Sequence, residues 1–217
     1  MVPLLLAGLL FAPGVAGAGP RTGPVHGVIL PPPPGHEVAF FGGYERLARA
    51  AGTPADGYGF LVAIRRVLAR TEAFGPVVEL DGGAELGFSR WVDGAHVVQP
   101  TEEHDRATLQ TTSFVAFGQL AVPLGRVRLS AGGGGGLALG HFEWHEPDRT
   151  NDRQARPVLA LARAGGGVEV RVADAAAVAL RAHYTFQLRD VTVALPTVAL
   201  APFSDVFALA LGVTYRF

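Results

Sequence analysis

Apolar and polar residues alternate through most of this chain. From residue 36 to the last residue, apolar side chains recur at every second position in one segment after another. A period of two residues is typical of a β-strand with one apolar face, whereas a helix repeats every 3.6 residues. Beyond the first 18 residues, no uncharged apolar run reaches the roughly 18 residues of a membrane-spanning helix. If the chain enters a membrane, we therefore expect a closed β-barrel.

The alternation divides into eight segments, which we predict to be antiparallel strands. They are 36–47, 56–68, 77–92, 108–122, 126–142, 157–172, 177–189 and 205–217. Each is about as long as the ~10 residues that a tilted membrane strand needs, and most are longer. The connections after the second, fourth and sixth segments are short, and the others are longer. This predicts an all-β, up-and-down transmembrane barrel with short periplasmic turns and longer extracellular loops.

The N-terminal residues 1–18 predict a secretory signal peptide. A short apolar core is followed by the breaker Pro13-Gly14 and the small residues Ala16-Gly17-Ala18. The alternative is a buried apolar helix, which the many Gly and Pro residues disfavour. Residues 19–35 are Pro-rich and predict an extended segment, so that the barrel itself occupies residues 36–217.

The composition excludes two classes of site. The chain has no cysteine, so it can form neither a disulfide nor a thiolate metal site. Its formal net charge is -1, and no basic cluster provides an electrostatic footprint for nucleic acid.

A run of five glycines, Gly132–Gly136, has the composition of a flexible linker. The stripe of apolar residues at odd positions nevertheless continues through it from Val127 to Leu139, so we predict that the run is part of the barrel wall. With the following loop centred near residue 150, the run would lie opposite residues 164–167. Two facing glycine tracts would let the wall bend and leave room for Arg163 and Arg181.

The face opposite the apolar stripes carries charged side chains, which we predict to fill the interior while the stripes contact lipid. This predicted interior network comprises Arg65, Glu79, Asp81, Glu85, Arg163, Glu169, Arg171 and Arg181. Simple hairpin registers place Arg65 opposite Glu79 and Glu169 opposite Arg181, and cross-strand pairs of opposite charge stabilise a ladder. The period alone leaves the reverse orientation open, as in a secreted lipocalin-like barrel.

The last segment, FALALGVTYRF, alternates up to its final aromatic residue. It resembles the C-terminal signature of outer-membrane β-barrels, in which a terminal Phe is recognised by the barrel-assembly machinery; here Tyr215 and Phe217 occupy those positions. The chain from about 36 to 217 resembles the small OmpA/OmpX-like barrel family. That resemblance implies a monomer in the outer membrane of a Gram-negative bacterium, with membrane lipids, lipopolysaccharide, periplasmic chaperones and the assembly machinery as partners.

Two further placements follow from a closed barrel. The last segment should pair with residues 36–47, since closure leaves no strand edge exposed. Several aromatic residues fall near strand ends, where we expect them to lie at the lipid–water interface; they are Tyr44, Phe88, Trp91, Trp144 and Tyr215.

Candidate chemistry is sparse, and we expect no catalytic, cofactor or metal site. His141 and His145 with Glu143 lie on a strand rather than a helix, which separates the two imidazoles. His183 and Thr185 only loosely resemble the His-x-Ser pair of lipid A deacylases, and both should point inward. The acidic loop residues Glu102, Glu103 and Asp105 are expected to be solvated rather than to bind a divalent cation.

The sequence thus favours a non-enzymatic outer-membrane barrel with an envelope-structural or surface-interaction role. The alternatives are a narrow channel or transporter for small or apolar solutes, a lipid A-modifying enzyme, and a secreted soluble barrel. The uncharged segment 191–203 either prolongs its flanking strands or covers the mouth of the barrel.

Overall fold

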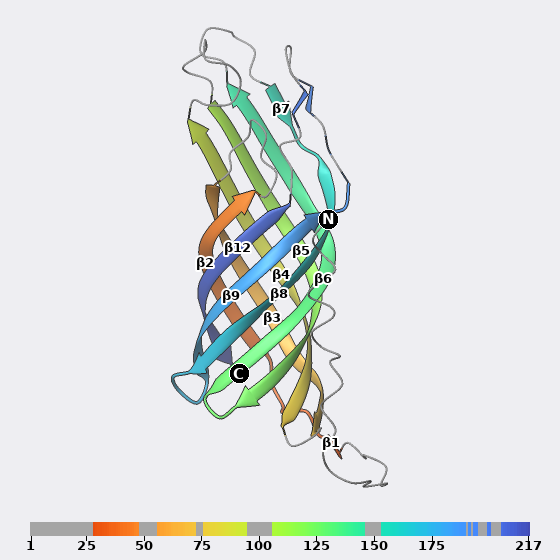
Figure 1. The fold of residues 1–217 in the computed structure, drawn as a ribbon, viewed down its shortest axis with the longest axis vertical. Helices are drawn as coiled ribbons and strands as arrows, with labels where there is room; N and C mark the ends of the chain where they lie inside the picture. The colour runs from red at the N-terminus through yellow and green to blue at the C-terminus, as the bar shows by residue number, and fades with distance from the viewer. Residues whose placement is uncertain are drawn as a thin grey trace, which may run out of the picture.

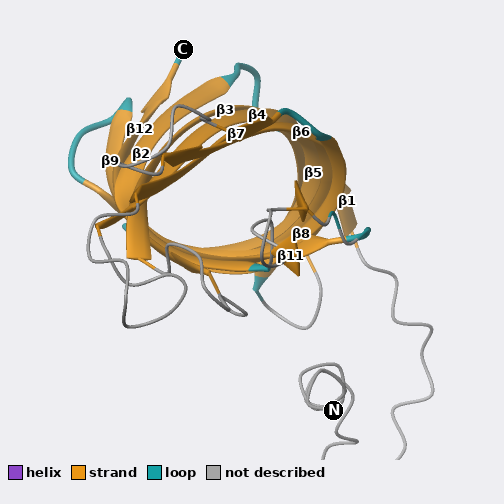
Figure 2. Cartoon of the chain, turned by 90° about the horizontal axis from the view of Figure 1, so that it is seen from above, coloured by secondary structure: helices purple, strands orange, loops and turns teal. Residues whose placement is uncertain are grey.

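The computed structural model is a closed, eight-stranded antiparallel β-barrel (Figures 1 and 2). It describes residues 28–47, 56–72, 76–94, 106–145, 153–189, 191, 193–194, 199–200 and 205–217. The wall consists of β2 (Glu37–Leu47), β3 (Asp56–Glu72), β4 (Val77–Gly94), β5 (Arg106–Leu124), β6 (Val127–His145), β8 (Val158–Arg171), β9 (Ala176–Gln187) and β12 (Val206–Arg216). These confirm all eight predicted strands.

Four short strands accompany the wall. β1 (Val28–Leu30) pairs with the end of β3, and β7 (Arg153–Ala155) pairs with β6. β10 (Val193–Ala194) and β11 (Ala199–Leu200) form a separate ladder, so the described part of the segment 191–203 does not prolong β9 or β12. No helix among the described residues is long and apolar enough to span a membrane. The predicted signal peptide lies outside the described residues.

Closure of the barrel follows the prediction, because β12 pairs with β2 from Val206↔Leu47 to Arg216↔Glu37. Beyond these strands, His36 and Phe217 exchange two backbone hydrogen bonds of 3.0 Å each. Gly35 turns the chain into β2 with a φ of 109°, and a Cβ there would lie 2.6 Å from the Phe217 carbonyl oxygen. Only glycine combines this left-handed φ with so close an approach.

The connections alternate in length as predicted. We call the end with connections 73–76, 125–126 and 172–175 the turn side, and the opposite end the loop side. β4, β5 and β6 have 18, 19 and 19 residues, whereas β2, β9 and β12 have 11, 12 and 11. The wall is therefore taller on the β4–β6 side, and these strands extend furthest toward the loop side in Figure 1.

The orientation of the strands also agrees with the prediction. Leu80, Val170 and Leu209 lie on the outer surface with 42%, 44% and 44% of their area exposed, whereas Glu79 and Glu169 are buried in the bore, the interior of the barrel. An outer surface covered by large apolar side chains is the pattern of a barrel surrounded by lipid. The reverse, lipocalin-like orientation is excluded.

The registers differ from the predicted ones. A bulge between Val67 and Ala69 and a turn centred beyond residue 74 place Arg65 opposite Gly83, so the predicted Arg65–Glu79 cross-strand pair is wrong. Glu169 lies opposite Ala179 and not Arg181, because the β8–β9 turn is centred one residue earlier than expected.

Trp91 does not lie at the outer surface, because its position in the alternation turns it into the bore, where it is 1% exposed. Tyr44, Phe88 and Tyr215 do face outward, with 46%, 39% and 56% exposed. The side chain of Trp144 lies outside the described part of the structure.

Gly132–Gly136 lies within β6 and forms part of the wall, not a hinge. The predicted facing of two glycine tracts is out of register by three residues, since Gly133 lies opposite Ala164 and only Gly132 meets a glycine, Gly165. The reason for the run lies on the β5 side. A Cβ on Gly134 would overlap the backbone of Ala116 and Phe117, so the close approach of β5 at this position requires glycine.

This close approach predicts different results for two adjacent glycines. Gly134→Ala should destabilise the barrel by about 1–3 kcal/mol, because the new methyl group has no space. Gly135→Ala should change stability by less than about 0.5 kcal/mol, since its Cβ would point outward and lie 3.6 Å from the Leu161 carbonyl oxygen. Urea unfolding of both variants in micelles measures the difference, and equal losses would contradict this explanation of the glycine run.

Candidate functional site

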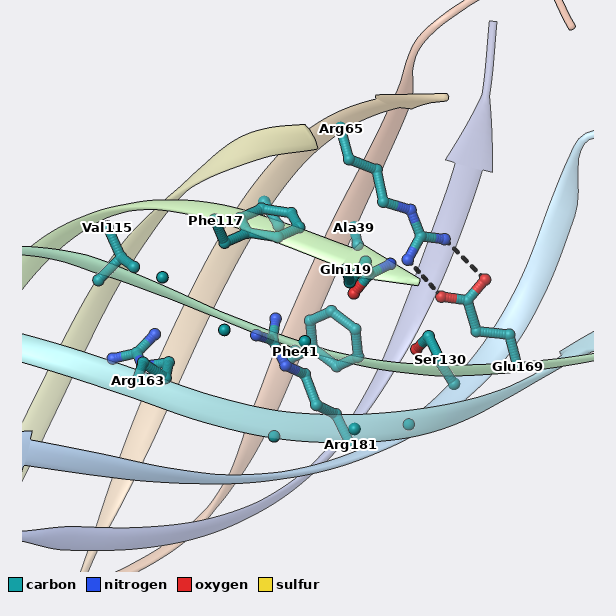
Figure 3. A pocket seen from close by; sticks show the side chains of 18 of the residues that line it. Ala39, Phe41, Arg65, Val115, Phe117, Gln119, Ser130, Arg163, Glu169 and Arg181 are labelled. Atoms are coloured by element: carbon teal, nitrogen blue, oxygen red, sulfur yellow. Dashed lines mark hydrogen bonds and ion pairs between the residues drawn. The ribbon is translucent and has the colours of Figure 1, made fainter. Parts of the chain in front are cut away.

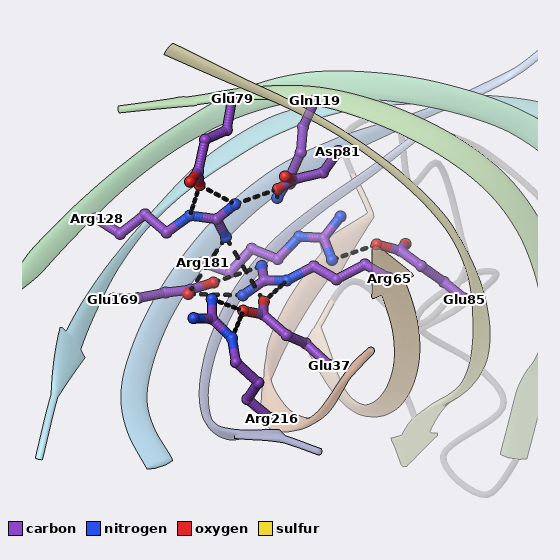
Figure 4. A network of polar contacts seen from close by, with 10 residues as sticks. All are labelled: Glu37, Arg65, Glu79, Asp81, Glu85, Gln119, Arg128, Glu169, Arg181 and Arg216. Carbon is purple, nitrogen blue, oxygen red and sulfur yellow. Dashed lines mark hydrogen bonds and ion pairs between the residues drawn. The ribbon is translucent and has the colours of Figure 1, made fainter. Parts of the chain in front are cut away.

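Buried charged side chains cross the bore toward the turn side (Figure 4). Arg65 on β3 donates from Nε to Glu37 Oε2 at 2.6 Å and from Nη2 to Glu169 Oε2 at 2.6 Å. Arg216 on β12 completes this group by donating to the other oxygen of Glu37, at 2.8 Å from its Nε. Two carboxylates and two guanidinium groups thus join β2, β3, β8 and β12.

A second group is centred on Arg128 of β6. Its Nη2 donates to Asp81 Oδ2 at 2.6 Å and to Glu79 Oε2 at 3.1 Å. The amide of Gln119 also donates to Asp81 Oδ2, at 2.8 Å, and Arg70 lies 3.6 Å from Glu79. Arg128 is also within 3.7 Å of Glu169, so the two groups form one connected network.

A third group lies in the middle of the bore around Glu85 on β4, which is 1% exposed. Arg163 Nη1 donates to Glu85 Oε2 at 2.8 Å, and Arg181 Nη1 donates to Glu85 Oε1. The Nε of Arg163 donates to the Thr185 hydroxyl at 3.0 Å. One buried carboxylate therefore holds two arginines.

Two of these ion pairs join opposite walls. In the order β4-β3-β2-β12-β9-β8, the pair Arg181–Glu85 joins β9 to β4 and the pair Arg65–Glu169 joins β8 to β3. Each pair spans four steps around an eight-stranded ring, which is the full width of the bore. The three groups together, which we call the bore network, therefore obstruct the interior at two levels.

The predicted interior residues are mostly brought together in this network. Arg65, Glu79, Asp81, Glu85, Arg163, Glu169 and Arg181 all take part. Arg171 does not lie in the network; it is exposed and lines a cavity of about 150 Å³ at the turn-side mouth. Three members of the network were not predicted, Glu37, Arg128 and Arg216, although Arg128 lies on the same face of β6 as the inward glycines.

A hollow of about 30 Å³ lies between the bore network and the glycines of β6 and β8, which we call the glycine wall (Figure 3). Arg181 crosses this region with its guanidinium carbon 5.9 Å from the ring centres of both Phe41 and Phe117. Arg163 and Arg181 both line it together with Gly132–Gly134 and Gly165–Gly167. The two arginines and the glycine wall thus share one part of the bore.

The loop-side part of the bore is apolar on one side and polar on the other. An apolar cluster of Leu47, Trp91, Leu109, Phe142 and other buried residues packs there. Beside it lies a cavity of about 50 Å³, which we call the loop-side cavity; it is also lined by Glu45, Arg163, His183 and Thr185. This compartment was not predicted.

Among the residues that the structure describes, the other candidates form no recognisable catalytic or metal site. His141 Nε2 lies 2.7 Å from Glu143 Oε1, but the described residues contain no group of three or more ligands that could hold a metal ion. His183 is buried and Thr185 accepts a hydrogen bond from Arg163. Glu102, Glu103 and Asp105 lie outside the described residues.

Comparison with known proteins identifies the fold and little beyond it. No protein-family model and no curated protein matches the sequence. A major outer membrane protein from Thermus thermophilus is similar in structure, with a TM-score of 0.55 and 12% identity over 84% of this chain and 98% of that chain. Ail from Yersinia pestis gives a TM-score of 0.46 with 13% identity, covering 84% and 99% of the two chains.

The N-terminal β-barrel domain of Pseudomonas aeruginosa OprF gives a TM-score of 0.42 with 18% identity, covering 84% and 96% of the two chains. These solved structures are small outer-membrane barrels, and the likeness to the Thermus protein establishes that this chain has the same kind of fold.

Proposed function

We propose that this chain, which has the fold of the small outer-membrane barrels, is a non-conducting and non-enzymatic protein of the outer membrane of a Gram-negative bacterium. Its role is to support the envelope or to present its loop side for surface interactions. The observation that carries the proposal is the combination of an apolar outer surface with a bore crossed by buried ion pairs.

The outer surface supports the location. Ile64, Leu137 and Leu211 are 46%, 57% and 62% exposed at the middle of their strands, where water would have to solvate them in a soluble protein. Lipid removes that cost, since the burial of apolar area is worth roughly 25 cal/mol per Å². Export by a signal peptide and insertion by the barrel-assembly machinery through Tyr215 and Phe217 belong to the same proposal, as does a monomeric state.

The bore network supports the absence of a pore. Side chains fill the interior of a barrel of eight strands, so no wide channel is expected. An ion would have to displace Arg181 from Glu85 and Arg65 from Glu169, and both pairs are buried. Separating a buried pair leaves uncompensated charges, which costs several kcal/mol.

Cell fractionation tests the location. We expect the protein in the outer-membrane fraction, extracted by detergent and not by high salt. An unheated sample should migrate differently from a boiled one on a gel, because a folded membrane barrel resists the detergent. Recovery in the soluble periplasmic or secreted fraction would refute the proposed location.

Planar bilayers test the closed bore. The purified protein is expected to give no discrete conductance steps at neutral pH in concentrated KCl, whereas a large porin reconstituted in the same way serves as the positive control. Reproducible steps would replace this function with the narrow channel for small solutes.

A further inference from the structure

One inward-facing row on the loop side has an unusual order of side chains. Following the strand pairing around the barrel, His183 on β9 lies beside Ala208, Ala208 beside Glu45, Glu45 beside Gly57, and Gly57 beside Trp91. Three large side chains, each with a polar atom, thus alternate with the two small residues. Because neighbouring strands lie about 4.8 Å apart, the large residues have Cα atoms roughly 10 Å apart. The small residues leave room for the large side chains, since the Trp91 ring lies directly over Gly57.

Each of the three large side chains carries a buried polar atom with no hydrogen-bond partner in the described structure. These atoms are Glu45 Oε2, Trp91 Nε1 and His183 Nδ1. The residues are only 9%, 1% and 6% exposed, so water outside the barrel does not serve them. Eight buried side-chain atoms among the described residues have no such partner, and these three line one cavity that none of the other five residues lines. Because buried polar groups are normally hydrogen-bonded, the clustering indicates a missing hydrogen-bonding partner there.

Glu45 also differs from the other buried acids in its charge environment. Glu37, Glu79, Asp81, Glu85 and Glu169 each lie within 4 Å of an arginine nitrogen. Among the described residues, no arginine or histidine forms an ion pair with Glu45, whose carboxylate is bonded to the hydroxyl of Ser89. Arg163 lines the same cavity, but its guanidinium donates to Glu85 and Thr185. A buried carboxylate without a cation is costly.

The loop-side cavity has room for a small molecule. Its volume of about 50 Å³ corresponds to roughly four water-sized groups. Leu109, Leu161 and Val206 supply apolar walls, and the three unpartnered polar groups line the same space. The site thus offers a carboxylate oxygen, an imidazole nitrogen and one N–H donor.

We propose that this row binds a small primary ammonium compound, such as an amino alcohol of about four heavy atoms. The ammonium group donates to Glu45 Oε2 and to His183 Nδ1, which accepts when the proton is on Nε2. The indole N–H of Trp91 donates to an oxygen of the same compound. The carbon chain packs against Leu109 and Leu161. This binding function is independent of whether the bore conducts ions.

Ethanolamine is a suitable probe, because it has an ammonium group, a hydroxyl group and four heavy atoms. The sequence contains two tryptophans, so the Trp144→Phe variant reports on Trp91 alone. We expect ethanolamine to change the Trp91 emission saturably in the submillimolar to millimolar range, which is typical of so small a ligand. Ethylene glycol and glycolate at equal concentrations should have no effect. The buffer is phosphate and the detergent a neutral maltoside, since Tris is itself a primary amine.

Glu45→Gln in the Trp144→Phe background should weaken ethanolamine binding at least 10-fold. The matched control is Glu143→Gln, which removes a carboxylate that is 46% exposed and leaves the affinity unchanged. Heat-dependent gel mobility verifies that each variant is folded. If Glu45→Gln does not fold, the comparison of ethanolamine with ethylene glycol and glycolate decides the question without it.

Three results would overturn the proposal. The first is the absence of a saturable response to ethanolamine, which would mean that the cavity holds water only. The second is an equal response to ethylene glycol. The third is an unchanged affinity for ethanolamine in a folded Glu45→Gln variant. Each of these leaves the fractionation and conductance results untouched, so this proposal and the membrane function fail separately.

Discussion

Glu85→Ala is expected to lower the free energy of unfolding by about 3–5 kcal/mol, the largest loss for a single substitution in the bore. Glu85 is the carboxylate partner of both Arg163 and Arg181, and its side chain is fully enclosed. Its removal leaves two guanidinium groups close together in the middle of the barrel. The strand pairing itself stays intact, so the loss measures the uncompensated charges.

Urea titration of the folded barrel in lipid vesicles measures this loss. Glu72→Ala, at an exposed turn-side position, is the control and should change stability by less than about 0.5 kcal/mol. Combining Glu85→Ala with Arg181→Ala should recover part of the loss, because the second change removes one of the stranded charges. A loss for Glu85→Ala no larger than that of Glu72→Ala would show that the bore network is solvated and weak.

Leu211→Arg is expected to lower the free energy of unfolding by about 2–4 kcal/mol in a lipid bilayer. Leu211 lies at the middle of β12, faces outward and has outward-facing Leu180 as its neighbour on β9. A guanidinium group at this depth would meet acyl chains and has no carboxylate beside it.

The matched control places the same side chain near the edge of the membrane. Val172, 65% exposed at the start of the β8–β9 turn, lies at the turn-side boundary, and Val172→Arg should cost no more than about 1 kcal/mol. Equal costs for the two arginine substitutions would mean that the apolar band does not contact lipid at the depth inferred here.

The number, order and orientation of the strands could be predicted because each rests on local alternation. Each of the eight apolar stripes corresponds to one strand of the wall, and the polar face opposite each stripe lines the bore. The strand 36–47 is the exception, because its inward face could not be recognised from the alternation. Both of its faces carry charged and aromatic residues, with Glu45 on one and Tyr44 and Arg46 on the other, so the alternation did not identify Glu37 and Glu45 as inward-facing.

The partners within the bore could not be predicted, for two physical reasons. The bulge near Leu68 and the exact centres of the turns shift the register by two to four residues, and neither feature leaves a signal in the period of two. Moreover, Arg65 and Arg181 pair across the bore with Glu169 and Glu85, whereas the predicted pairs joined adjacent strands. Long side chains in a narrow barrel reach the opposite wall.

The junction of β2 and β12 sets the order of events when the barrel forms. The contact between Glu37 and Arg216 joins residues separated by 179 positions. β2 pairs with β3 on one side, and its other edge pairs with β12, the last strand of the chain. Contacts so distant in sequence form slowly, because a large loop must close first. One edge of β2 therefore stays unpaired until β12 is in place. We expect this exposed edge to need protection from aggregation until the barrel closes.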